Sequence, residues 1–231
     1  NVYQNYIKGN LVYATGRINF ETETEKAVNH FSCTSISEKD IHVIPQGKKL
    51  RVITATDGSL TTGVDWADPR VKDGNVISNV AEDVLKMVVV NRYTDAIPSV
   101  GFVKGFGFKE GAIAGSIAHD SHNIIAVGVD DLDIIRAINR IIDTKGGIAT
   151  VHNDLIKDLP LDVAGLMSRE KGEFVASRYQ EVNNEALQLG TSMTSPFMTL
   201  AFMALLVIPE LKLGDQGLFD VAKFQPVSLF E

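Results

Sequence analysis

The sequence of 231 residues contains a single cysteine, Cys33, so no disulfide can form within the chain. This excludes the small secreted folds that several disulfides stabilise. No neighbouring residue suggests that the thiol is a nucleophile, and we expect a small core residue at this position.

Basic residues are also few. Lysine and arginine number 22 against 29 aspartates and glutamates, which gives a net charge of −7, and no basic run occurs. A surface that binds nucleic acid usually carries a basic excess, because it must neutralise phosphates. We therefore expect no nucleic-acid partner.

Long apolar runs are missing as well. The longest begins at Pro196 and has roughly 12 apolar residues between two prolines, whereas a helix that spans a bilayer needs about 20. No signal-peptide pattern is visible. We expect this run to form a buried helix, and we expect no membrane partner.

What is present is the composition of a globular protein, with 45% hydrophobic and 22% charged residues. A chain of this length can bury a sizeable core. Polar residues and Pro45, between Ser35 and Gly47, indicate a linker. We therefore predict a short β segment at residues 1–47 and a main domain at residues 48–231.

Strand patterns dominate the first half of the main domain. Asp73-Gly74 is a hairpin signal, and residues 83–93 form a nearly continuous apolar run. Two more apolar strands are expected on either side of a polar turn near residue 120. The glycines of residues 101–115 lack the spacing of a dinucleotide-binding or phosphate-binding loop, so we expect them in turns.

Helical patterns follow in the second half. The apolar spacing predicts a helix that starts after Asp130 or Asp131 and stops at Gly146. A second amphipathic helix is expected at 169–189 and a short apolar one at 197–206. The predicted class is α+β, with mostly antiparallel sheets and two to three packed helices.

The strongest local signal is the stretch IAHDSHN, in which His119, Asp120 and His122 lie within four residues. A histidine pair at this spacing, with a carboxylate between, can ligate a metal or perform acid–base chemistry. Two histidines do not complete a tetrahedral metal site, however, and Asp120-Ser121 is also favourable turn chemistry. The residues alone leave a functional turn and a structural turn equally open.

The stretches around this turn also carry a resemblance. Residues 101–128, GFVKGFGFKEGAIAGSIAHDSHNIIAVG, are similar to the corresponding stretch of bacterial adenine deaminases of the amidohydrolase superfamily. Further stretches resemble the same family in order and spacing, at 159–168, 196–221 and 223–230. The resemblance covers the chain from about Leu50 to its end. The first 45 residues are less distinctive and resemble the strands and linker that follow the family's catalytic barrel.

This resemblance implies a hydrolase that deaminates adenine to hypoxanthine and ammonia, in purine salvage in the cytoplasm. It implies a binuclear centre of Mn²⁺ or Fe²⁺, held by an N-terminal (β/α)8 barrel whose first strand carries an H-x-H pair. This sequence has no H-x-H pair and no alternating strand–helix units. We therefore expect a C-terminal part that is inactive alone, with the barrel as its partner in a homo-oligomer.

Two hypotheses describe what such a part does. In the first, the turn reaches the active site: His119, Asp120 and His122 are accessory catalytic candidates, Ser121 and Asn123 are candidates for binding adenine, and the two histidines are candidate metal ligands. In the second, the domain is a structural or oligomerisation module, and the turn is an internal hydrogen-bond network. A free-standing relative with its own metal chemistry is a third option.

Overall fold

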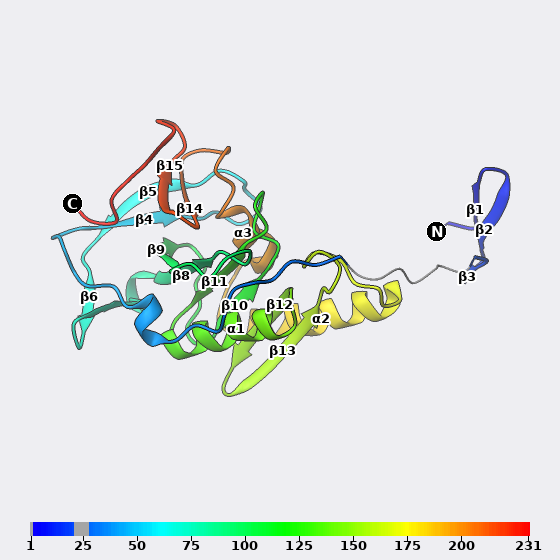
Figure 1. Ribbon diagram of the computed structural model, residues 1–231, viewed down its shortest axis with the longest axis horizontal. Coiled ribbons are helices and arrows are strands. Elements are labelled where there is room, and N and C mark those ends of the chain that lie inside the picture. The colour runs from blue at the N-terminus through cyan, green and yellow to red at the C-terminus, as the bar shows by residue number, and fades with distance from the viewer. Residues whose placement is uncertain (1, 21–27) are drawn as a thin grey trace.

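The structure is a computed structural model that describes residues 2–20 and 28–231 (Figure 1). Its first part is a three-stranded antiparallel sheet, formed by β1 (Gln4–Ile7), β2 (Asn10–Ala14) and β3 (Arg17–Ile18). Gly9 and Gly16 lie at its two turns in the left-handed conformation, which glycine adopts without steric cost. The small β segment expected at the start of the chain is thus present.

A mixed sheet of eight strands forms the centre of the remaining chain, in the order β13-β12-β10-β11-β8-β9-β4-β5. Neighbouring strands are antiparallel except β4 and β9, which run parallel. The strands are β4 (Leu50–Thr54), β5 (Gly63–Ala67), β8 (Val84–Val90), β9 (Ser99–Lys104), β10 (Ala112–Gly115), β11 (Ile124–Gly128), β12 (Gly147–His152) and β13 (Leu155–Pro160).

The two faces of this sheet belong to separate cores, because successive side chains of a strand point to opposite faces. In β8, Met87 and Val89 contribute to the core shared with α2 (Gly172–Gln188) and α3 (Pro196–Phe202). Val88 and Val90 contribute to the core beneath α1 (Asp131–Asp143). All seven residues of β8 are buried, which explains why its sequence is nearly continuously apolar.

Helix α1 begins and ends as predicted. Asp130 is the N-cap, and its carboxylate accepts a hydrogen bond of 2.9 Å from the Leu132 amide. Gly146 follows the helix with φ 117°, a conformation that L side chains rarely adopt. The buried residues of the helix are Ile134, Ile135, Ala137, Ile138 and Ile141.

Helices α2 and α3 are shorter than predicted. α2 begins at Gly172 rather than Arg169, whose guanidinium forms an ion pair with Asp162 instead. α3 ends at Phe202, because the carbonyl of the next residue, Met203, accepts a hydrogen bond of 3.0 Å from the Leu213 amide. A strand thus takes the hydrogen bond that a longer helix would need.

The remaining strands form two small sheets: β6 (Arg70–Lys72) with β7 (Asn75–Ile77), and β14 (Leu211–Gly214) with β15 (Gly217–Asp220) and β16 (Gln225–Pro226). The predicted turn joins β6 to β7, with Asp73 and Gly74 both at positive φ. Two 3₁₀ helices are present, η1 (Glu38–Ile41) and η2 (Val80–Glu82).

Within residues 2–20 and 28–231, three α-helices accompany mostly antiparallel sheets, and no (β/α)8 barrel is formed. This confirms the predicted α+β class. None of the helices in these ranges combines the length and the apolar character that crossing a membrane requires.

The last residues of the chain lie along the start of β4. The amides of Lys48 and Lys49 donate to the Glu231 carbonyl at 3.0 and 3.3 Å, and the Glu231 amide donates to the Lys49 carbonyl at 3.1 Å. The Arg51 amide donates to the Leu229 carbonyl at 2.8 Å. The first and last parts of the main domain are therefore paired side by side.

We call Val28–Cys33 the incoming segment. The β-rich sequence of His30–Ser35 predicts a strand, but no strand ladder forms there. Instead, the Ser32 amide donates to the Arg92 carbonyl at 2.8 Å, and the Val28 carbonyl accepts from the Ala164 amide at 2.7 Å. The segment therefore lies between the end of β8 and the loop at 161–168. The division of the chain at residue 47 stays a prediction.

Candidate functional site

The predicted polar turn connects β10 to β11, two central strands of the large sheet. All five candidate residues lie on this connection, which we call the His119–Asn123 turn. The His119 amide donates to the Ala201 carbonyl of α3 at 3.0 Å, and the His122 amide donates to the Ala118 carbonyl at 2.6 Å. The backbone of the turn is therefore fixed both to itself and to a neighbouring helix.

His119 lies against an apolar cavity of about 240 Å³ between the sheet and helices α2 and α3. Its ring is stacked on Phe202, with centroids 5.0 Å apart and an angle of 16° between the planes. Tyr179 of α2 is the other side chain of the lining that carries a polar group. The imidazole is therefore oriented by aromatic contact at the border of an open, mostly apolar space.

His122 lies 5.6 Å from His119 between ring centroids, in an edge-to-face arrangement. Burial lowers its pKa below the ordinary value of 6.5, and the nearby charges of His119 and Arg92 lower it further, whereas Asp120 opposes them. Its Nδ1 is buried and has no hydrogen-bond partner within the described residues. Near pH 7 this imidazole is neutral, and a neutral imidazole can accept a proton.

The other three candidates differ in exposure. Asp120 and Ser121 are exposed, whereas Asn123 is buried. The Asn123 side chain donates to Ser121 Oγ at 3.1 Å and accepts from the Arg92 amide at 3.3 Å. Asn123 therefore holds the turn from inside, while Asp120 and Ser121 present their polar groups to solvent.

The turn does not form a complete metal site. Across the described ranges, no group of three or more histidine, cysteine, aspartate or glutamate side chains could hold a metal ion. His119 and His122 supply at most part of a ligand set, and a catalytic metal usually has three protein ligands. We therefore assign no chemical step to a metal held by this turn alone.

Sequence reasoning missed Arg92 and Tyr93, which follow β8 after Asn91. The Tyr93 hydroxyl donates to the Ser121 carbonyl at 2.8 Å, and Arg92 Nη2 donates to that hydroxyl at 2.9 Å. The available signal was a charged residue two positions after a strand that is apolar except for Lys86. The partners on the turn lie far along the chain and could not be inferred from spacing.

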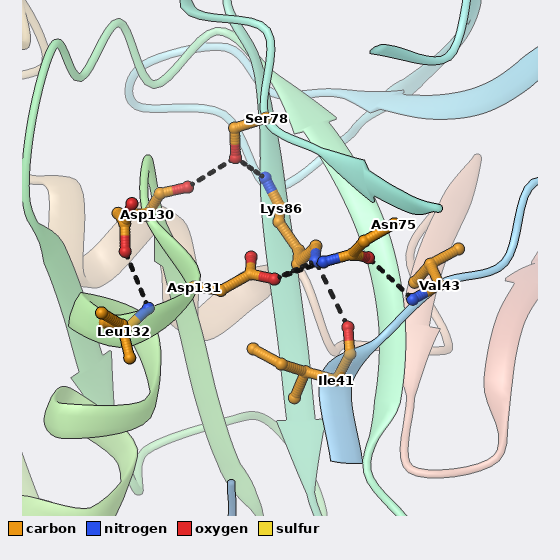
Figure 2. A network of polar contacts seen from close by, with 9 residues as sticks. Ile41, Val43, Asn75, Ser78, Lys86, Asp130, Asp131 and Leu132 are labelled. Atoms are coloured by element: carbon orange, nitrogen blue, oxygen red, sulfur yellow. Dashed lines mark hydrogen bonds and ion pairs between the residues drawn. The ribbon is translucent and has the colours of Figure 1, made fainter. Parts of the chain in front are cut away.

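A second buried cation, Lys86 of β8, also escaped prediction (Figure 2). Its ammonium lies 2.7 Å from an Asp131 carboxylate oxygen and 3.3 Å from the Ile41 carbonyl, and no part of the residue is exposed. Asn75 donates to the same carboxylate oxygen at 2.8 Å. This network joins β8, η1 and the start of α1, and it explains the aspartate that follows the helix cap.

The isolated histidine His152 is part of an ion-pair cluster rather than a ligand set. Its Nδ1 lies 2.7 Å from Glu185 of α2, and its Nε2 lies 3.3 Å from Glu110. Lys157 also contacts Glu185, at 2.6 Å. The hydrogen bond with Glu185 raises the pKa of His152. The cluster ties the β12–β13 hairpin to α2.

Comparison with known proteins matches the family that the motifs resemble. A family model described as adenine deaminase C-terminal domain matches residues 59–225. An adenine deaminase of Methanosarcina barkeri is 53% identical to this chain over 238 residues, which is 100% of this chain and 43% of that protein. Adenine deaminases of Salinibacter ruber and Parabacteroides distasonis are each 44% identical, and the matches cover 42% and 41% of those proteins. The chain spans about two fifths of the length of these relatives.

Proposed function

Since the chain belongs to the adenine deaminase C-terminal domain family, we propose that it is the C-terminal part of an enzyme that hydrolyses adenine to hypoxanthine and ammonia. The match over the whole chain to proteins named adenine deaminase supports this proposal. Purine salvage in the cytoplasm is the setting that we propose for the reaction.

The location of the His119–Asn123 turn supports a direct role in that reaction. Arg92 accepts a backbone hydrogen bond from Ser32 of the incoming segment, and its neighbour Tyr93 donates to Ser121 of the turn. Because the family's domain is C-terminal, the incoming segment leads from the upstream part of the polypeptide. The turn therefore lies beside the place where that upstream part joins the domain.

The side chains of the turn suit the proton transfers of hydrolytic deamination. Water adds to the ring carbon that carries the amino group, so one proton must leave the water and the departing nitrogen must gain one. His122 is neutral near pH 7 and can accept a proton, and His119 borders the open cavity. The exposed Asp120 and Ser121 can bind polar atoms of adenine, while Asn123 orients Ser121.

We propose that the binuclear Mn²⁺ or Fe²⁺ centre belongs to an upstream amidohydrolase barrel, which is the partner of this domain within a homo-oligomer. When bound, such a centre supplies an activated water. His119 and His122 are at most additional ligands, because the described residues provide no third one nearby.

The purified 231-residue chain, supplied with adenine and added Mn²⁺ or Fe²⁺, is expected to show no turnover. Hypoxanthine formation measured by liquid chromatography tests this, and the full-length enzyme serves as the positive control. Turnover by the isolated chain at a rate near that of the full-length enzyme would contradict the assignment of the main metal centre to the upstream part.

The alternative is a structural or oligomerisation module with no direct catalytic role. The stacking of His119 on Phe202 and the internal hydrogen bonds of Asn123 favour it. Replacing His119 and His122 by alanine in the full-length enzyme separates the two functions. A direct role predicts loss of turnover with an unchanged melting temperature, whereas a structural role predicts a lower melting temperature with intact kinetics.

A further inference from the structure

Arg92 is a buried arginine at the end of β8, with 4% of its surface exposed. Its guanidinium carbon lies 4.9 Å from the ring centre of Phe31 and 4.7 Å from that of Tyr93. Phe31 belongs to the incoming segment. A guanidinium that lies over two aromatic rings is attracted by both of them, which restricts its orientation.

The hydrogen bonds of Arg92 reach three other parts of the chain. Nη1 donates to the Ala164 carbonyl at 2.8 Å, and Nη2 donates to the Tyr93 hydroxyl at 2.9 Å. Its backbone carbonyl accepts from Ser32, and its backbone amide donates to Asn123. One residue thus joins the incoming segment, the loop at 161–168 and the polar turn.

Two routes lead from Arg92 to the His119–Asn123 turn. The first runs through the Tyr93 hydroxyl, which accepts from Arg92 and donates to the Ser121 carbonyl. The second runs from the Arg92 amide to Asn123, whose side chain then donates to Ser121 Oγ. Both routes end on Ser121, which lies between the catalytic candidates Asp120 and His122 in the sequence.

The space for the guanidinium is kept open by a glycine. A Cβ atom at Gly165 would lie 2.1 Å from Arg92 Nη1, and this glycine has φ +70°, where other side chains are strained. The Gly165 carbonyl accepts from Ser116 Oγ at 2.5 Å, beside the cavity residue Gly115. The loop is therefore shaped to receive Arg92 and is itself attached to the strand that leads into the turn.

We propose that Arg92 is a positioning residue for adenine deamination: it holds the His119–Asn123 turn at the place where the incoming segment joins the domain. This inference rests on the proposed function of the turn. Arg92 touches no substrate atom in this role. It acts through Tyr93 and Asn123, which fix the backbone that carries the two histidines.

The test compares three variants of the full-length enzyme. Arg92→Met removes the donors and the charge, Arg92→Lys keeps the charge, and Arg51→Met is the matched control. Arg51 also lies over an aromatic ring, 4.4 Å from the centre of Trp66, and donates to a backbone carbonyl, that of Ser228. It is on β4, which β8 and β9 separate from β11.

Arg92→Met is expected to lower kcat roughly 10- to 100-fold, as loss of a residue that orients a reacting group does, with a smaller change in KM. Arg92→Lys recovers part of this loss, and Arg51→Met retains wild-type kcat. If Arg92→Met does not fold, Tyr93→Phe cuts the first route and keeps the ring, and it is expected to lower kcat as well. A kcat for Arg92→Met or Tyr93→Phe equal to that of Arg51→Met would overturn the proposal.

Hydrogen exchange in the 231-residue chain provides a second readout that is independent of activity. Arg92→Met is expected to speed exchange of the His122 amide, whereas Arg51→Met leaves it unchanged. Unchanged His122 exchange in Arg92→Met would overturn the positioning role. If the wild-type full-length protein does not deaminate adenine, the proposed function fails, and the exchange result still reports whether Arg92 holds the turn.

Discussion

Two residues of the large sheet and its first helix show how a buried charge is tolerated in this protein. Lys86 lies wholly inside, and burial lowers its pKa, while the hydrogen bond and charge of Asp131 act in the opposite direction. Removing the partner of a buried charge usually costs more free energy of unfolding than removing the buried charge itself. In the first case a charge remains buried without a partner. The pair therefore makes an asymmetric prediction.

Asp131→Asn is expected to lower the free energy of unfolding by about 3–5 kcal/mol, because it leaves the buried ammonium without an anion. Lys86→Met is expected to cost less, since its side chain fills the same space and Asp131 retains Asn75 and partial exposure to water. Urea denaturation of the 231-residue chain measures both. Asp68→Asn, which breaks the exposed pair with Lys49, is the control and is expected to cost less than about 1 kcal/mol. Equal losses for Asp131→Asn and Asp68→Asn would contradict this account.

His152 makes the stability of the protein depend on pH. Its pKa is raised above 6.5 in the folded state by Glu185, and Glu110 adds to this, while Lys157 contacts the same glutamate from the other side. The folded state therefore binds the proton more tightly than the unfolded state. The stability that this supplies is complete below pH 6.5 and is lost as the pH rises through the folded pKa.

Wild type is accordingly expected to exceed His152→Gln in stability by the largest margin below pH 6.5, and this margin shrinks at higher pH. Thermal unfolding across pH 5–9 measures the difference. His42→Gln, at an exposed position, is expected to show no such trend. A margin that grows as the pH rises would show that His152 is neutral in the fold.

At the scale of single elements, helix α3 depends on a lysine that lies outside it. Lys212 of β14 donates to the Phe202 carbonyl at the end of α3 at 3.0 Å and to the Leu60 carbonyl at 2.8 Å. Burial disfavours the charged form and lowers the pKa of Lys212 to about 8. The ring of Phe202 is stacked on that of His119, and both residues line the cavity. The hydrogen bond from Lys212 to the Phe202 carbonyl therefore helps to fix this side of the cavity.

The stability of wild type is expected to rise, relative to Lys212→Met, as the pH increases from about 8 to 10.5. In that interval the unfolded state binds the proton of Lys212 and the folded state does not. Urea unfolding at several pH values measures the difference between the two proteins. Lys48→Met, at an exposed lysine, is the control, and its difference in stability from wild type is expected to stay constant across this pH range. A difference in stability between wild type and Lys212→Met that does not change with pH would contradict a lowered pKa of Lys212.

The same scale shows which elements can be predicted. The helix from Asp131, the turn at Asp73-Gly74 and the strands beside the polar turn were all predicted, because their signals are local. The end of α3 was not, because a strand ten residues later takes its hydrogen bond. The turn of the candidate site was predicted in the same way, from neighbouring residues.

At the scale of the whole molecule, the order of strands in the sheet was beyond prediction. β4 pairs in parallel with β9, and the partners Ile53 and Val103 are 50 residues apart in the sequence, so nothing in either strand specifies the other. The contacts of Arg92 have the same origin, since Phe31, Ala164 and Ser121 lie far apart in the chain. Resemblance to a family supplied what local patterns could not, namely the reaction that we propose for the turn.

The cavity face predicts how the isolated chain behaves in solution. Tyr179 and Met198 line the cavity and are 39% and 59% exposed, so apolar surface is open there. Exposed apolar surface favours association, and we expect the 231-residue chain to self-associate with rising concentration. Light scattering measures this. Met198→Glu is expected to reduce it and Ile97→Glu, at an exposed position away from the cavity lining, to leave it unchanged. A monodisperse monomer at all concentrations would contradict the prediction.

The pairing of the last residues with the start of β4 has a consequence for synthesis. The amides of Lys48 and Lys49 pair with Glu231, and that of Arg51 pairs with Leu229, so one side of the start of β4 stays unpaired until residues 229–231 have been synthesised. The pairing that closes this edge therefore forms late in synthesis. A chain truncated before Leu229 is expected to expose the backbone of residues 48–51.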